Sequence, residues 1–432
     1  MAAVLDTTRS PVVPHRTPLP RPTGDGLPII WRADQPDRDA SAFLRMLNLA
    51  TRIKPFDAYS LEDIRELWRL TALALSHRPE LPSVHQHHFE GPGGQLLVRV
   101  YKPREDDIPR PAFLWVHGGG FMVGGLDTAD SICRNIALEA DCITVALSYR
   151  LAPEHGLDAS REDCLAGLDW VIEHAEELGI DASRLAIGGE SAGGNLAAVM
   201  AQEARRRELE LALQVLVYPA TELEESFPSL RENVDGYMIT ADMLGHIQRT
   251  VAGAVSHLDL GSPWLSPRRE RNLSGLTPAV VVSAGFDPIR DDGLDYTSRL
   301  RKAKVPVQLL HYPGQFHGFL NFDAINGGAA DALRRIASAL VQAFAGEHPD
   351  ITLEMADPTS DRSLFGEGRS TTLSLWNATD GWRDALLTRA NPRLARVTRW
   401  ALRPYTIASR PLRHVLQDEA AHLAVQTYPA ES

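Results

Sequence analysis

The feature that most constrains the fold is an alternation, from about residue 86 to residue 346, of short apolar segments with stretches of helical periodicity. The apolar segments have strand length and are apolar on both faces, so each must be covered on both faces of a sheet. The clearest of them are 95–103, 112–116, 143–149, 184–188, 213–219, 279–285 and 307–313. Strands separated by helices pair in parallel, because the helix supplies the crossover. The sequence therefore predicts an α/β domain with a mostly parallel central sheet and helices on both faces.

Two amphipathic helices are predicted before the first of these strands. Apolar residues recur at i, i+3, i+4 and i+7 from Phe43 to Ala50, which is the spacing of one helix face. Ser60, followed three residues later by Asp63, has the pattern of a capping box and predicts the start of a second helix. Because both helices precede every strand, we expect residues 28–85 to form an N-terminal helical cap.

Composition divides the rest of the chain. Residues 1–27 are rich in proline and are expected to be a disordered leader. Residues 86–346 are assigned to the α/β domain, and within it 221–277, where the periodicity is weaker, is expected to be a cap insert. Residues 347–432 are predicted to be a linker followed by a basic C-terminal extension.

The basic extension is the part of the chain with the most unusual charge. Between Trp382 and Leu416 eight arginines accompany a single acidic residue, Asp384, although the whole chain carries −12. An amphipathic basic segment of this kind is suited to peripheral contact with an anionic membrane. Packing onto the acidic remainder of the chain and free solvation are nevertheless favoured over membrane contact, because Pro392 and Pro404 limit the length of any helix here. A protein partner is a further alternative, and the oligomeric state is left open.

Composition also argues against several classes of protein. A net charge of −12 is opposite to that of a general nucleic-acid binder. Cys133, Cys142 and Cys164 have no CxxC spacing, which favours reduced thiols over a disulfide framework or a zinc site. The longest apolar runs are shorter than the ~18–20 residues of a membrane span, and the N-terminus lacks the pattern of a signal peptide. We expect a cytoplasmic protein without a metal or organic cofactor, in which the histidines of residues 85–88 lie exposed on an edge strand.

A single serine lies among glycines where a predicted strand meets a predicted helix. Gly189-Glu190-Ser191-Ala192-Gly193 matches G-x-S-x-G, the sharp strand-to-helix turn that exposes a nucleophilic hydroxyl. Glycine at 189 and 193 allows strand and helix to approach closely. The backbone N–H groups at the start of the helix favour negative charge beside the hydroxyl.

Three further segments with chemically active residues follow predicted strands. The segment 117–121, "HGGGF", comes directly after strand 112–116, and its glycines let backbone N–H groups approach a substrate oxygen. Asp287 follows strand 279–285 and His317 follows strand 307–313. Asp291, Asp292 and Asp295 are alternatives to Asp287, which is favoured because it is nearest to the strand end.

Together these motifs resemble the hormone-sensitive-lipase-like family of α/β-hydrolase esterases. "HGGGF", "SYRLAPE", "GESAGGN", "DPIRDDG" and "HGF" occur in the order of that family over roughly residues 85–345. The resemblance implies that Ser191 is the nucleophile, His317 the base and Asp287 the acid that orients it. It also implies an oxyanion hole formed by the N–H groups of Gly119, Gly120 and Ala192, with Gly118 shaping the turn.

The resemblance further implies an activity and a substrate class. It predicts hydrolysis of carboxylic esters with short to medium acyl chains, through an acyl-enzyme. Phe121 and Met122 are candidates to line the substrate pocket, although packing in the core explains them about as well. Amide or lactone hydrolysis by the same residues is the nearest alternative. A non-catalytic small-molecule receptor of the same fold is disfavoured by the presence of His317.

Two positions depart from the usual pattern of the family. Glu190 stands where aspartate is most common, and Asp292 where glutamate is usual. Both substitutions keep a carboxylate, so the chemistry implied by the resemblance is unchanged.

Overall fold

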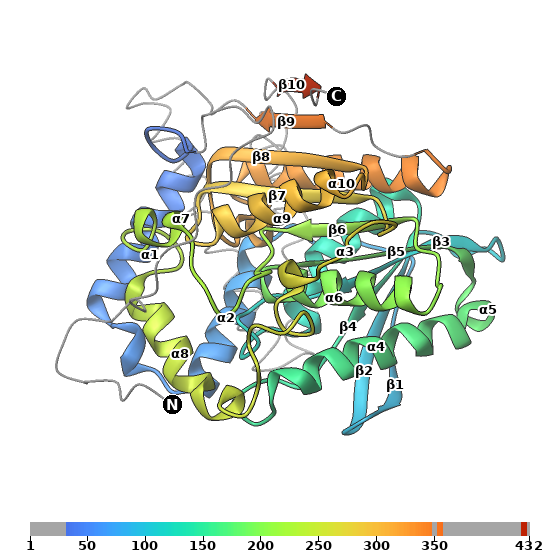
Figure 1. Ribbon diagram of the computed structural model, residues 1–432, viewed down its shortest axis with the longest axis horizontal. Helices are drawn as coiled ribbons and strands as arrows, with labels where there is room; N and C mark the ends of the chain where they lie inside the picture. The colour runs from blue at the N-terminus through green and yellow to red at the C-terminus, as the bar shows by residue number, and fades with distance from the viewer. Residues whose placement is uncertain (1–31, 348–351, 357–424, 430–432) are drawn as a thin grey trace, which may run out of the picture.

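A computed structural model of the chain describes residues 32–347, 352–356 and 425–429. In this part of the chain one sheet has the strand order β1-β2-β4-β3-β5-β6-β7-β8-β9-β10 (Figure 1). The strands are β1 (Ser83–Gly91), β2 (Gly94–Lys102), β3 (Arg110–Val116), β4 (Ile143–Leu147), β5 (Ile180–Glu190), β6 (Leu213–Val217), β7 (Ala279–Phe286), β8 (Val307–Phe316), β9 (Thr352–Ala356) and β10 (Val425–Pro429). Each predicted strand is present, and β1 is an additional strand that begins before the predicted boundary at residue 86.

The central strands pair in parallel, as the alternation of strands and helices predicts. β4, β3, β5, β6, β7, β8 and β9 are parallel neighbours. β1, β2 and β10 are antiparallel to their neighbours and lie toward the two edges. The carboxyl ends of β5, β6, β7 and β8 therefore meet at one edge of the sheet.

Helices cover both faces of this sheet, so the predicted layer architecture is confirmed. On one face lie α3 (Leu126–Ala140) and α10 (Gly327–Phe344), and on the other α4 (Leu157–Glu173), α6 (Ala192–Arg206) and α9 (Arg290–Lys302). The strands between them are buried along their whole length in β3, β4, β6 and β7. A short helix, α5 (Ala175–Leu178), leads into β5.

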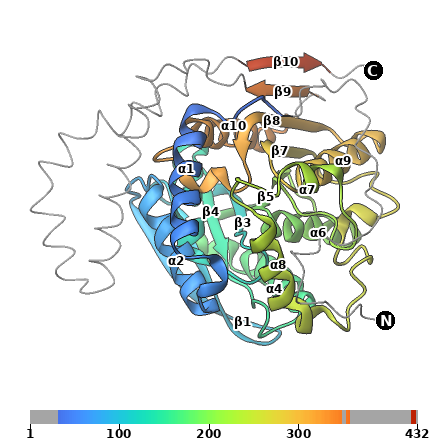
Figure 2. The same ribbon diagram turned by 90° about the vertical axis from the view of Figure 1, so that its left-hand side faces the viewer.

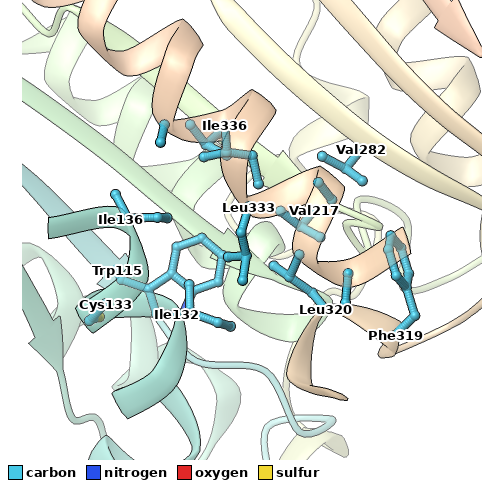
Figure 3. Close-up of a cluster of buried hydrophobic side chains, with 14 of the residues drawn as sticks. Trp115, Ile132, Cys133, Ile136, Val217, Val282, Phe319, Leu320, Leu333 and Ile336 are labelled. Atoms are coloured by element: carbon cyan, nitrogen blue, oxygen red, sulfur yellow. The ribbon is translucent and has the colours of Figure 1, made fainter. Parts of the chain in front are cut away.

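Trp115 of β3 anchors the apolar layer on the α3 and α10 face. Its side chain is fully buried and lies among residues of both helices (Figure 3). Ile132 and Ile136 come from α3, and Leu333 comes from α10. Two helices distant in sequence are thus joined to the sheet through one aromatic side chain.

The two predicted N-terminal helices are present. They are α1 (Arg38–Ile53) and α2 (Leu61–Leu75), joined by the short helix η1 (Phe56–Ala58). The predicted capping box is confirmed, since the Ser60 hydroxyl accepts from the Asp63 N–H at 3.1 Å and the Asp63 carboxylate accepts from the Ser60 N–H at 3.2 Å.

Residues 221–277 contain a second group of helices. These are α7 (Pro228–Glu232), α8 (Ala241–Val255) and η2 (Pro267–Arg269), while η3 (Phe319–Phe322) follows β8. Ile247 and Val251 of α8 pack in one apolar cluster with Ile64 of α2 and with Met122. Accordingly α1, α2 and α8 lie together at one end of the molecule (Figure 2).

The expectation of a linker directly after residue 346 is wrong for residues 352–356. They form β9, which pairs in parallel with β8 and antiparallel with β10. Pairing here is favoured because β8 would otherwise present a row of unpaired backbone groups at the sheet edge. The leader, residues 1–27, and the basic segment from Trp382 to Leu416 lie outside the described residues.

Other sequence expectations have the following outcomes. All three cysteines are buried free thiols. Strand β1 is an edge strand on which His85 and His88 are exposed, whereas His87 is half-buried beside Trp170. Among the described residues no group of histidine, cysteine and acidic side chains could hold a metal ion. None of the helices described here has the length and apolar character that crossing a membrane requires.

Replacing Leu333 by Ala should lower the free energy of unfolding by about 2–5 kcal/mol, because the deletion leaves a cavity beside Trp115. Leu138→Ala is the matched control, since Leu138 is 42% exposed on α3, and its expected effect is within about 0.5 kcal/mol. Urea denaturation of both variants measures the difference. Equal losses would contradict the position of Leu333 in the core.

Candidate active site

Ser191 occupies the turn between β5 and α6. Its backbone has φ 54° and ψ −117°, a region that residues with a side chain rarely adopt. The Ser191 N–H donates to the Val217 carbonyl at 2.9 Å, and the Ser191 carbonyl accepts from the Ala220 N–H at 3.2 Å. These two hydrogen bonds, one to the end of β6 and one to the segment after it, hold the strained turn predicted from the sequence.

Two glycines make room for this turn. A Cβ atom at Gly193 would lie 2.1 Å from the Val116 carbonyl oxygen, and one at Gly189 would lie 2.3 Å from the Gly193 carbonyl oxygen. Both separations are far below a real contact, so the first turn of α6 can pack against the ends of β3 and β5 only without side chains. The close approach predicted at residues 189 and 193 is confirmed.

The structure brings Ser191, His317 and Asp287 into one hydrogen-bonded line. The His317 Nε2 lies 2.9 Å from the Ser191 Oγ, and the His317 Nδ1 lies 2.9 Å from the Asp287 Oδ2. The strand register places Asp287 and His317 side by side. Phe286 of β7 pairs with Phe316 of β8, and these two residues directly precede Asp287 and His317.

The other candidate acids at this loop make different contacts. Asp291 accepts from the Ser229 N–H, Asp292 accepts from the Thr221 N–H, and Asp295 pairs with Arg268. Only Asp287, among the four aspartates, meets His317. The carboxylate of Asp287 is fully buried, and its second oxygen accepts from the Ile289 N–H at 2.8 Å.

The loop after β3 presents backbone donors beside Ser191. Gly119 and Gly120 have φ values of 120° and 60°, and the Gly119 carbonyl accepts from the N–H groups of Met122 and Val123. Within the described residues the N–H groups of Gly119, Gly120 and Ala192 donate to no acceptor. The Gly118 N–H instead points to the Glu190 carboxylate at 3.4 Å, which suits a residue that shapes the turn.

Phe121 and Met122, the two candidates for the substrate pocket, are both buried in apolar clusters. Phe121 is 6% exposed, and the Arg161 guanidinium lies over its ring at 5.2 Å. Met122 is 2% exposed and packs with Ile64 of the cap. Core packing, the alternative that the sequence left open, accounts for the position of both side chains.

Two apolar side chains from residues 221–277 reach the site and were missed by the sequence analysis. Ile247 of α8 faces Gly120, since a Cβ atom there would lie 3.6 Å from its Cδ1. Met238 faces Gly318, the residue after His317, with 4.0 Å from the corresponding Cβ position to its Cγ. The weak periodicity of this segment gave no signal for either residue.

A buried arginine that the sequence analysis also missed contacts the helix after Ser191. Arg161 of α4 donates to the Asn195 side chain at 2.6 Å and to the carbonyl groups of Trp264 and Leu265. It forms no ion pair within the described residues, and burial lowers the pKa of its guanidinium to about 9. Because Asn195 belongs to α6, this side chain ties the helix after Ser191 to the segment before η2.

Two buried carboxylates near the site have raised pKa values. Asp292 is buried beneath the segment after β6, and burial raises its pKa to about 8 although Thr221 and the Glu222 N–H donate to it. Burial also raises the pKa of Glu190, against hydrogen bonds from Tyr218, Gly118 and Asn321 that lower it. The sequence analysis noted Glu190 and Asp292 as departures from a family pattern but did not predict their burial.

Comparison with known proteins agrees with this geometry. A protein-family model for the alpha/beta hydrolase fold matches residues 113–321. Esterase LipI of Mycobacterium tuberculosis is 38% identical over 286 residues, which cover 65% of this chain and 89% of the relative. Ethyl acetate hydrolase of Pseudomonas putida is 33% identical, with coverage of 70% and 98%. A solved structure of a hyperthermophilic esterase from the archaeon Pyrobaculum calidifontis has a TM-score of 0.65 at 34% identity and covers 69% of this chain and 97% of its own.

Fold and site together define a serine hydrolase of the α/β-hydrolase fold. Similarity over most of the length of several esterases narrows the class further. The chain belongs to the hormone-sensitive-lipase-like family of α/β-hydrolase esterases, and it is a carboxylic ester hydrolase.

Replacing Gly193 by Ala should reduce kcat/KM by about 10²-fold or more, because the clash with Val116 displaces the adjoining Ala192 N–H. That N–H is a predicted oxyanion donor, and losing one such donor has an effect of this size. Gly253→Ala in α8 is the control. An added Cβ atom there meets nothing within 4 Å, so activity should be unchanged and helix stability should rise by up to about 1 kcal/mol. Ester hydrolysis assays and thermal unfolding measure both effects. Full activity in the Gly193 variant would refute the tight turn.

Proposed function

We propose that the enzyme hydrolyses carboxylic esters through an acyl-enzyme formed on Ser191. The observation that carries this proposal is the hydrogen-bonded line from Asp287 through His317 to Ser191. The line ends beside backbone N–H groups that have no acceptor in the described part of the chain.

The first half-reaction transfers the acyl group to the enzyme. The Ser191 Oγ attacks the ester carbonyl carbon while the His317 Nε2 takes its proton. Asp287 accepts from the His317 Nδ1–H, which leaves the Nε2 lone pair directed at the hydroxyl and stabilises the imidazolium that forms. The tetrahedral intermediate then loses its alcohol, which leaves with the proton held on Nε2.

The negative charge of the intermediate is stabilised by backbone donors. We assign this role to the N–H groups of Gly119, Gly120 and Ala192, each worth about 10²–10³ in rate. These donors are held by backbone geometry, so they need no reorganisation when the charge develops. Water then attacks the acyl-enzyme with His317 again as base, and the carboxylic acid is released with Ser191 restored.

Short to medium acyl chains are the proposed substrates. One support is the similarity to a relative named ethyl acetate hydrolase. The other is the position of Ile247 and Met238, whose apolar side chains face the loops on the two sides of Ser191. We also infer a cytoplasmic location, which is supported by three buried cysteines that remain free thiols.

Ser191→Ala should abolish turnover of p-nitrophenyl acetate and labelling by a fluorophosphonate, because it removes the hydroxyl that lies beside the His317–Asp287 pair. Ser283→Ala is a demanding control, since the Ser283 Oγ also lies 2.6 Å from a histidine nitrogen, that of His311, but deep between two strands. This control should keep the label and the activity. A modified residue other than Ser191, located by mass spectrometry, would refute the assignment.

A panel of p-nitrophenyl esters from acetate to palmitate should give the highest kcat/KM at short to medium chain length. Matched amide and lactone substrates in the same panel should react at least about tenfold more slowly than the best ester. A lactone or amide that exceeds every ester would favour the alternative activity. Saturable binding of a ligand without any turnover would favour a receptor.

A further inference from the structure

Glu190 is the last residue of β5 and directly precedes Ser191, yet its carboxylate is buried. The side chain is 4% exposed. It accepts from the Tyr218 hydroxyl at 2.8 Å, from the Asn321 Nδ2, and from the Gly118 N–H at 3.4 Å. These donors come from the loop after β3, the segment after β6 and the helix after β8, so one carboxylate contacts three of the loops that form the site.

No lysine or arginine forms an ion pair with Glu190 in the described part of the chain. Burying a carboxylate away from a cation is unfavourable unless hydrogen bonds and a nearby positive charge compensate for it. Three hydrogen bonds supply part of that compensation. A positive charge on His317, which it acquires when it takes the proton of Ser191, supplies more of it, because that charge lowers the pKa of Glu190.

Tyr218 connects Glu190 physically to His317. Its hydroxyl donates to the carboxylate, while its ring lies 4.7 Å from the imidazole ring at an interplanar angle of 53°. Tyr218 has a φ of 33°, an unfavourable value for a residue with a side chain, so tertiary contacts hold it in this place. The imidazole is therefore bounded by Asp287 at Nδ1 and by the Tyr218–Glu190 pair against its ring.

Three titratable groups beside this cluster have pKa values that favour their neutral forms at pH 7. Burial lowers the pKa of His117 to about 4, and burial raises the pKa values of Tyr149 and Tyr218 well above their usual range. The charged groups around the cluster are the carboxylates of Glu190 and Asp287 and two guanidinium groups. Arg161 donates to Asn195, and Arg290 pairs with Asp291 and Glu232.

We propose that Glu190 is a positioning residue that couples the oxyanion loop to His317 and, as a carboxylate, stabilises the imidazolium formed during catalysis. This inference rests on the proposed function. Through Gly118 the carboxylate fixes the turn that precedes the oxyanion donors, and through Tyr218 and Asn321 it fixes the segments beside the imidazole. Its charge acts at the moment when His317 is protonated.

Glu190→Gln tests the charge, because glutamine keeps the size of the side chain. Loss of a negative charge disfavours protonated His317. The acid limb of the pH profile of kcat/KM, which is the fall in activity toward low pH, should therefore move to lower pH by about one unit. The value of kcat should fall by about tenfold, with a smaller change in KM. Glu190→Asp keeps the charge on a shorter side chain, so its acid limb should stay in place while kcat falls.

Asp331→Asn is the matched control. Asp331 is a buried carboxylate that accepts from the Tyr312 hydroxyl at 2.8 Å, as Glu190 does from Tyr218, but it forms no hydrogen bond to the triad within the described residues. Its acid limb should coincide with that of the wild type. A shift of equal size in this variant would overturn the proposal, because the effect would then belong to any buried carboxylate.

An acid limb that does not move in Glu190→Gln would also overturn the proposal, because Glu190 would then act by packing alone. If that variant does not fold, Tyr218→Phe decides. It removes a hydrogen bond that lowers the pKa of Glu190, so Glu190 is protonated more readily and the acid limb should move in the same direction by a smaller amount. An unchanged acid limb in Tyr218→Phe would likewise overturn the proposal. Failure of the proposed function is distinguishable, because Ser191→Ala would then retain activity.

Discussion

In-register parallel pairing is the constraint on which the rest of this structure depends. Phe286 pairs with Phe316, so the residues that follow them, Asp287 and His317, leave the sheet side by side. One strand further, the end of β6 accepts from the Ser191 N–H and thereby fixes the hydroxyl opposite the imidazole. A one-residue slip in either ladder would turn these side chains to the wrong face, because strand side chains alternate.

Two buried charges flank the strained serine turn, and neither has an oppositely charged partner in an ion pair within the described residues. Arg161 directs its guanidinium to Asn195 and to backbone carbonyl groups on one side. Glu190 receives three neutral donors on the other. Burial of unpaired charges destabilises a fold, so stability alone does not explain them. Their common feature is contact with the segments that carry the proposed oxyanion donors and the proposed base, where fixed charges and dipoles are most effective.

Sequence reasoning succeeded mainly where the pattern lies within a few neighbouring residues. The Ser60–Asp63 cap is formed by residues three apart, and the central strands are recognised because they are apolar on both faces. One local signal was overlooked: in residues 352–356 apolar Leu353 and Met355 alternate with polar neighbours, a strand pattern that was included in the expected linker, and this segment pairs with β8 as β9. Signals that depend on a distant partner were missed. Ile247 and Met238 reach the site only because the segment 221–277 folds back over it.

By itself the sequence determined the fold class, the turn at Ser191 and the order of the three strand-end residues, because each follows from short-range periodicity or from glycines within a few positions. Only the tertiary structure decided which of four neighbouring aspartates meets His317, and which backbone N–H groups remain without an acceptor. It also decided that Glu190, Tyr218 and Asn321 converge. The physical reason is distance along the chain: these contacts join residues that become neighbours only once the sheet register and the positions of the loops are set.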